Sequence, residues 1–156
     1  MSNFYKDEKA ENIYKELGKP EGKKEKLFES MKDVYMLSLL LGIKYEENNP
    51  IEKKSSDPIK EEIFGEENIR IMNMLALYMT KDINILNKSE ESEKCIHNMM
   101  ENYANGGIFK FYELLDGNLN NLDGLISFVK NLENKEQEIK KVDIADLLND
   151  VTNHLE

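Results

Sequence analysis

The chain has 156 residues and 40% apolar side chains, which is enough for one domain with a buried core and excludes a wholly disordered protein. Its charged residues make up 33%, and no apolar run approaches the roughly 20 residues that cross a bilayer, so a membrane-embedded protein is excluded. The net charge is −10 and Arg70 is the single arginine. Direct DNA binding by the isolated chain is therefore not expected, because duplex recognition needs a positive surface.

The N-terminal segment and the cysteine content predict a cytoplasmic location. The first 17 residues carry several acidic groups and no apolar core, unlike a signal or transit peptide. Cys95 is the single cysteine, so an intramolecular disulfide is impossible and a reducing compartment is favoured. We expect no association with a membrane.

Helical spacing of apolar residues dominates the first half of the chain and predicts an all-α fold. A first helix is expected over residues 6–17, followed by a charged lead-in. Ser30 and Asp33 have the spacing of a capping box, which predicts a helix over residues 31–41 that ends at Gly42. This segment is apolar almost all round, as is typical of a buried central helix.

Three elements are expected in the middle of the chain. Residues 44–56 have no helical period and predict an exposed loop. Asp57 followed by Pro58 predicts the start of a short helix that ends near residue 65. A second central helix is expected over 66–80, where Met74 and Leu77 make its other side apolar as well. Residues 83–86 then predict a turn or a short extended piece.

The C-terminal half predicts four more helices. Ser89 begins one that ends at Asn105–Gly106–Gly107, since Asn and Gly adopt the left-handed backbone conformation of a helix end at little energetic cost. Residues 108–115 form the next, and two further apolar stripes cover 122–132 and 139–155. The whole is expected to be one compact domain of six to eight helices. Its parts are an N-terminal helix and lead-in (1–27), a helical core (28–116) and a C-terminal helical pair packing on that core (117–156).

Few residues offer catalytic or metal-binding chemistry. Glu93, His97 and Glu101 fall on one helix face, but one helix supplies too few converging ligands, and an exposed charged face is the favoured interpretation. Cys95 would need a neighbouring base and a lowered pKa to act as a nucleophile, and beside Ile96 it is interpreted as a small buried side chain. Asn105–Gly106–Gly107 lacks the Lys and Ser/Thr of a phosphate-binding loop. We therefore predict no enzyme activity, no cofactor and no metal.

Four sequence blocks together resemble a known family. They are KDVYMLSLLLG (32–42), DPIKEEIF (57–64), DINIL (82–86) and ENYANGG (101–107), in this order. The combination is similar to the DNA phosphorothioation-associated protein 4 family, a small family associated with the Dnd system. The chain departs from the family pattern at Ser38, Leu39, Leu40 and Asn102. The resemblance covers roughly residues 28–108, and the four blocks leave open whether residues after about 115 belong to the shared core.

The resemblance implies a role in a bacterial anti-phage system that places sulfur in the DNA backbone. The protein would be a non-catalytic accessory or regulatory subunit that contacts the larger proteins of that system. The block residues that the core does not require form a possible interaction surface: Lys32, Asp33, Asp57, Tyr103, Asn105, Gly106 and Gly107. Helix caps and turns are the alternative explanation for all seven.

Two other hypotheses stay open. A nucleic-acid-associated regulator that acts as an oligomer would need a basic stripe, for which the candidates are Lys23, Lys24, Lys26, Lys53 and Lys54. An enzyme would need Glu93, His97 and Glu101 to converge from two chains. Self-association into a homo-oligomer is compatible with each hypothesis.

Overall fold

The computed structural model describes residues 3–18, 28–119, 123–131, 133 and 134. Of these residues 71% are helical, in five α-helices and three short 3-10 helices, and a small two-stranded sheet is also present. The mostly helical prediction is confirmed. The expected six to eight helices are too many, and the sheet was not expected. The chain divides into two compact units, Met1–Glu113 and Leu114–Glu156.

The first unit begins with a short strand that the sequence does not predict, just before the predicted helix over residues 6–17. Strand β1 (Asn3–Phe4) pairs antiparallel with β2 (Ile59–Lys60). The Asp7 side chain then accepts a hydrogen bond from the Lys9 backbone N–H and caps a short 3-10 helix, η1 (Glu8–Ala10). Helix α1 (Glu11–Gly18) follows. Helix α1 therefore starts several residues later than predicted, because Asp7 ends the extended segment and caps the 3-10 helix that precedes α1.

Helix α2 (Met31–Lys44) confirms the predicted start and corrects the predicted end. The Ser30 hydroxyl and the Asp33 carboxylate form the expected capping box. Gly42 does not end the helix, which continues to Lys44. The loop over residues 45–56 agrees with prediction, apart from an isolated bridge between Asp7 and Lys54.

The short helix predicted at Asp57 is absent from the described residues, because Ile59 and Lys60 are extended against β1. A 3-10 turn, η2 (Glu61–Ile63), leads instead into helix α3 (Gly65–Thr80), close to the predicted second central helix. The turn expected at residues 83–86 is the 3-10 helix η3 (Ile83–Leu86).

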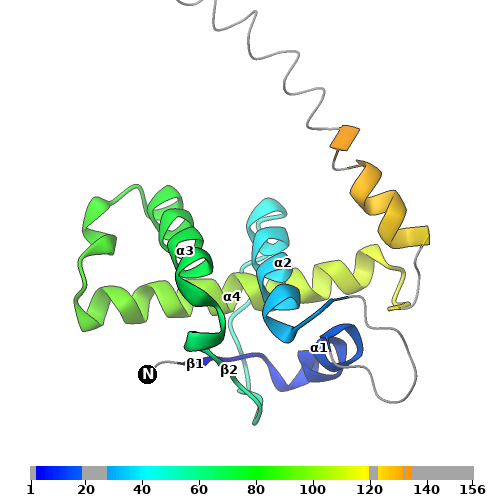
Figure 1. Cartoon of the computed structure of the whole chain (residues 1–156), viewed down its shortest axis with the longest axis horizontal. Coiled ribbons are helices and arrows are strands. Elements are labelled where there is room, and N and C mark those ends of the chain that lie inside the picture. Colours follow the sequence, from blue (N-terminus) through cyan, green and yellow to red (C-terminus); the bar gives the residue numbers. More distant parts are fainter. Residues whose placement is uncertain (1–2, 19–27, 120–122, 132, 135–156) are drawn as a thin grey trace, which may run out of the picture. The chain divides into compact units, whose positions relative to one another are not determined.

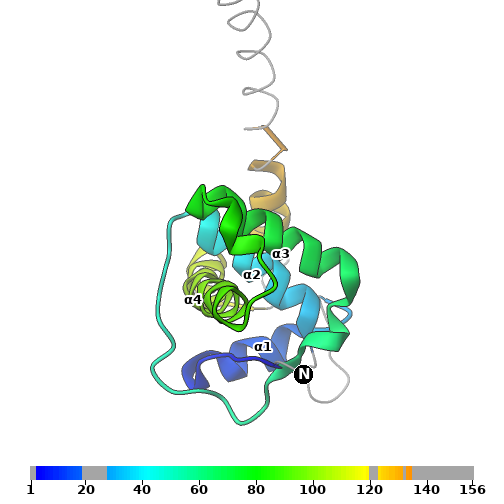
Figure 2. The ribbon, with the colours of Figure 1, turned by 90° about the vertical axis from the view of Figure 1, so that its left-hand side faces the viewer.

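Helix α4 (Glu90–Leu114) is a single helix of 25 residues. The predicted break at Asn105–Gly106–Gly107 is wrong, and the two helices expected on either side of it are one. Helices α2 and α3 lie side by side and both run across α4 (Figure 1), while α1 lies on another side of α4 (Figure 2). The core of the unit is therefore built around α4.

In the second unit residues 123–131 are helical, as the sequence predicts. The helix expected over 139–155 lies outside the described residues, and the packing of residues 117–156 on the core stays a prediction. In the described part of the chain, no helix combines the length and the apolar character that crossing a bilayer requires.

Candidate functional site

Helices α2 and α4 meet backbone against backbone, and glycines make this approach possible. A Cβ atom added to Gly42 would lie 1.9 Å from the Tyr103 carbonyl oxygen, and one added to Gly107 would lie 1.7 Å from that of Ser38. Real carbon and oxygen atoms do not approach so closely. Gly42 and Gly107 therefore serve the helix crossing rather than helix ends, which is why both sit inside helices.

The loop after α2 is held against α4 in the same way. A Cβ atom on Gly106 would lie 2.0 Å from the Glu47 carbonyl oxygen. The Asn105 side-chain amide donates a hydrogen bond of 3.0 Å to the Asn49 carbonyl oxygen. Asn105, Gly106 and Gly107 are all buried, so the block ENYANGG (101–107) organises the core here.

The other predicted surface residues have separate environments. Asp33 is engaged in the capping box, and Lys32 beside it is half-buried. Asp57 is exposed, with its carboxylate 3.9 Å from the buried Lys6 ammonium group. Tyr103 is half-buried on α4. The proposed interaction surface formed by the seven residues stays a prediction, and burial of three of them favours the structural explanation for those three.

The face of α4 that carries Glu93, His97 and Glu101 is not the uniformly exposed face that was expected. The Glu101 carboxylate is buried and accepts a hydrogen bond of 2.8 Å from the Tyr5 backbone N–H. Burial raises the pKa of Glu101, opposed by this hydrogen bond and by the charge of Lys54. Among the described residues, no three His, Cys, Asp or Glu side chains are placed to hold a metal ion.

Cys95 is exposed, so its interpretation as a small buried side chain is wrong. It is next to the buried Ile96 in the sequence, but successive helical residues face different directions.

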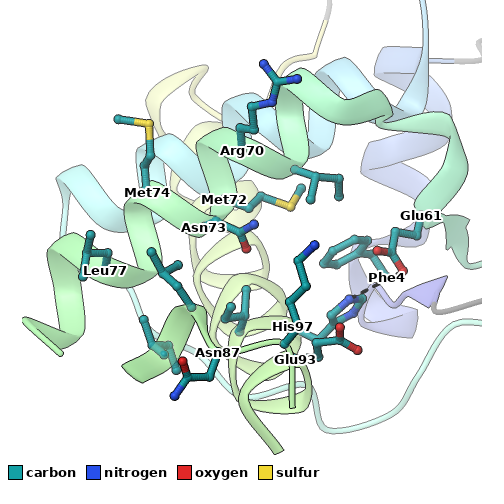
Figure 3. Close-up of a pocket in the computed structure, with 15 residues that line it drawn as sticks. Phe4, Glu61, Arg70, Met72, Asn73, Met74, Leu77, Asn87, Glu93 and His97 are labelled. Atoms are coloured by element: carbon teal, nitrogen blue, oxygen red, sulfur yellow. Dashed lines mark ion pairs between the residues drawn. The ribbon is translucent and has the colours of Figure 1, made fainter. Parts of the chain in front are cut away.

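A groove of about 620 Å³ opens between α3, η3 with the two residues after it, and the N-terminal half of α4 (Figure 3). We call it the α3–α4 groove. Its buried floor consists of Phe4, Met72, Ile85 and Ile96. Figure 3 shows Met72 directed into the hollow, with Phe4 and His97 at one end. Strand β1 thus places the fourth residue of the chain against α4.

Large apolar side chains are exposed along the α3–α4 groove and next to it. Met74 and Leu86 line the groove with exposed fractions of 70% and 38%. Tyr78 on α3 and Ile83 on η3 are 65% and 66% exposed. Sequence analysis detected the second apolar side of α3 but read it as evidence of burial. The structure leaves much of it in solvent.

The groove is lined by two carboxylates, Glu61 and Glu93, and by two basic residues, Arg70 and Lys88. His97 stacks on Phe4 with ring centroids 4.2 Å apart, and its Nε2 atom lies 3.8 Å from the Glu61 carboxylate. Burial lowers the pKa of His97 below 6.5, against the opposing effect of Glu61 and Glu93, so the imidazole is neutral at pH 7. Within the described part of the chain, neither Glu61 nor Glu93 forms an ion pair with Lys or Arg.

The basic stripe required by the nucleic-acid hypothesis is not assembled among the described residues. The Lys53 ammonium group lies 2.7 Å from Glu8, and that of Lys54 lies 3.9 Å from the Tyr5 ring centroid. Lys23, Lys24 and Lys26 lie outside the described residues.

Comparison with known proteins identifies one family. Residues 6–147 match the family model described as DNA sulphur modification system-associated protein 4. The match extends well beyond residue 115, which answers the question that the four blocks left open: most of the C-terminal part belongs to the shared region. No curated protein and no solved structure matches the chain.

Proposed function

The chain belongs to the DNA sulphur modification system-associated protein 4 family, and from this premise we propose that it is a non-catalytic accessory protein that acts through protein contacts. Its association with a DNA sulphur modification system follows from the family. The way in which it acts, by binding larger proteins of that system through the α3–α4 groove, is the proposal.

The observation that carries the proposal is the apolar rim of the groove. Contiguous apolar surface on a soluble protein typically marks a site of interaction with another molecule, because leaving it in water is unfavourable. Met74 and Leu86 line a concave site, while Tyr78 and Ile83 extend the apolar surface beside it. Concave apolar sites accept the large anchoring side chains that dominate protein interfaces.

Charge supports a protein rather than DNA as the direct partner. The chain carries a net charge of −10. A net negative charge repels a phosphate backbone. It is compatible with a basic protein surface, to which negative charge gives faster association.

Co-purification from a host that carries the sulphur modification system tests the proposal. The chain would carry its tag at the C-terminus, because Phe4 lines the groove, and each lysate would be divided into nuclease-treated and untreated samples. We expect proteins of the system to co-purify in both samples. Loss of those proteins after nuclease treatment would contradict direct protein contact and favour a nucleic-acid-linked role.

A double variant tests whether the groove makes the contact. Met74→Ser with Leu86→Ser is expected to abolish co-purification, because it removes the exposed apolar side chains that line the groove. The matched control is Leu40→Ser with Tyr112→Ser, which changes two exposed apolar residues that do not line it. Equal capture by both variants would exclude the groove as the binding site.

A further inference from the structure

We propose that the outer face of α3 pairs with the same face of a second copy of this chain, antiparallel and around a two-fold axis at Met74. The outer face of α3 consists of Glu67, Arg70, Met74, Tyr78 and Lys81. This inference goes beyond the proposed function, because the second copy would cover the outer side of α3 and leave the floor of the α3–α4 groove to another partner.

The five residues of this face are exposed and share one side of the helix. Arg70 and Tyr78 each stand four residues from Met74, and these spacings recur on a single helix face. Met74 and Tyr78 are 70% and 65% exposed. Figure 3 shows Arg70 and Met74 directed away from Met72, which points into the groove. Helix α3 therefore turns two large apolar side chains outward near the middle of the face.

The two ends of the face carry opposite charges. Glu67 and Lys81 each stand seven residues from Met74, Glu67 toward the N-terminus and Lys81 at the residue that ends α3. Among the residues that the structure describes, Glu67 has no basic partner and Lys81 has no carboxylate partner. The Lys81 ammonium group instead lies 3.9 Å from the Tyr78 ring centroid, which keeps it on this side of the helix. Each end is thus open to a group of the opposite charge.

A two-fold axis at Met74 brings the opposite ends together. In an antiparallel pair, residues meet when they stand equally far from the axis on opposite sides, so Met74 meets Met74 of the second copy. Arg70 meets Tyr78, whose ring accepts a guanidinium group on its face. Glu67 meets Lys81 in an ion pair, and symmetry gives two such pairs per dimer. A parallel pair would set Glu67 against Glu67 and Lys81 against Lys81. The charges therefore favour the antiparallel arrangement.

The dimer is expected to be weak. Each copy carries a net charge of −10, and this repulsion is screened beyond about 8 Å at physiological ionic strength, whereas ion pairs in contact are not. Arg70 also lies 2.8 Å from Glu66, but the two side chains are 73% and 88% exposed, and an ion pair so exposed is weak enough to exchange. One helix face per copy is a small interface, so the dimer is expected to dissociate on dilution.

Exchange of the two end charges tests the pairing in solution. Analytical ultracentrifugation of the full chain at about 0.15 M salt measures dimerisation as the concentration rises. Glu67→Lys and Lys81→Glu are each expected to weaken dimerisation by about tenfold or more, because every dimer then contains two like-charge contacts. An equimolar mixture of the two variants is expected to regain wild-type affinity, since both ion pairs form again between unlike chains.

Matched controls separate these contacts from general repulsion. Glu113→Lys and Lys53→Glu make the same changes in net charge at exposed residues outside the face, and neither is expected to weaken dimerisation to the same extent. Glu67→Lys also makes the chain less negative, so general repulsion between copies predicts tighter rather than weaker association of this variant.

Crosslinking tests the position of the axis. Met74→Cys, with Cys95→Ser to remove the native thiol, is expected to form a covalent dimer in oxidised glutathione, because the two introduced thiols meet at the axis. Glu67→Cys with Cys95→Ser is expected to form little, since antiparallel pairing separates the two copies of that position by about 21 Å along the helix.

Several results would overturn the inference. A wild-type chain that stays monomeric up to about 1 mM would do so, as would a mixture of the two charge variants that does not regain affinity. Crosslinking through Glu67→Cys as efficient as through Met74→Cys would show a parallel or random contact. The proposed function is decided separately by co-purification, because neither Glu67 nor Lys81 lines the α3–α4 groove.

Discussion

The two halves of α4 pack in opposite ways. The C-terminal half approaches α2 so closely that Gly42 and Gly107 have no room for a Cβ atom. The N-terminal half stands apart from α3 and leaves the α3–α4 groove, with Met74 and Leu86 exposed on its lining. The C-terminal half of α4 is covered by α2 of the same chain, and we propose that a partner covers the groove beside the N-terminal half.

The difference separates the sequence blocks into two kinds. Blocks 32–42 and 101–107 supply the glycines of the tight crossing. Blocks 57–64 and 82–86 supply Glu61, Ile85 and Leu86 to the groove. The four blocks therefore contribute both to the tight crossing and to the groove.

The largest expected effect is at the tight crossing. Gly107→Ala is expected to lower the free energy of unfolding by about 3 kcal/mol or more, because the new methyl group meets the Ser38 carbonyl oxygen, which cannot move without shifting α2. Chemical denaturation followed by circular dichroism measures this.

Gly65→Ala is the control for that prediction. Gly65 has a φ of 68° with no atom within 4 Å of an added Cβ, so only backbone strain of roughly 1–2 kcal/mol is expected. An equal loss of stability in the two variants would mean that α2 and α4 are not in backbone contact.

Substitution of Glu101, which lies between the two halves of α4, is expected to have an intermediate effect on the free energy of unfolding. Glu101→Ala leaves the partly buried Tyr5 N–H without its acceptor, which costs about 1–3 kcal/mol. Glu101→Gln keeps an acceptor oxygen and removes the charge that burial disfavours, so it is expected to be more stable than wild type at pH 7.

The pH dependence of the glutamine variant tests the cause. The pKa of Glu101 is raised above 4.5, so the folded state binds the proton first as the pH falls. The advantage of Glu101→Gln is therefore expected to shrink as the pH falls through the folded pKa toward 4.5. A constant difference between the two proteins at all pH values would rule out ionisation of Glu101 as its source.

At the exposed rim of the groove, substitutions are expected to have little effect on the free energy of unfolding. Met74→Ser alters a side chain that is 70% exposed, so the free energy of unfolding is expected to change by less than about 0.5 kcal/mol. Met72→Ala, two residues away and buried, is expected to cost about 2–5 kcal/mol. Similar losses in the two variants would show that Met74 is part of the core.

The smallest expected effect is the titration of His97. Nuclear magnetic resonance is expected to give this imidazole a pKa below 6.5, with His154 assigned separately through a His154→Gln variant. Because the unfolded chain takes up the proton first, stability is expected to decrease as the pH falls from about 6.5 toward the folded pKa. Glu61→Gln is expected to lower the pKa further. A pKa above 6.5 would mean that charge, not burial, dominates at this end.

Local patterns in the sequence predicted local structure well. Ser30 and Asp33 predicted the start of α2, and the apolar period of residues 66–80 predicted α3. The short helix predicted from Asp57 and Pro58 is wrong, because the extended conformation of Ile59 depends on pairing with Phe4, 55 residues earlier. Pairing over such a distance leaves no local pattern.

The glycines and methionines show why the site was harder to predict. Gly106 and Gly107 match the sequence pattern of a helix end. Only the position of the neighbouring backbone reveals that they allow another segment to approach α4 closely. Met72 and Met74 belong to the same helix, yet one is buried and the other exposed. The periodicity of a helix marks its apolar sides but does not say which side the chain itself covers.

The position of α4 also determines when this protein can fold during its synthesis. Tyr5 finds its carboxylate acceptor only at Glu101, 96 residues later, and Asn49 is fixed by Asn105. The ribosome therefore completes α1, α2 and α3 before the helix that they pack against exists. Until then their apolar faces are open to chaperones and to one another, so the first unit is expected to fold in one cooperative step once Leu114 has emerged.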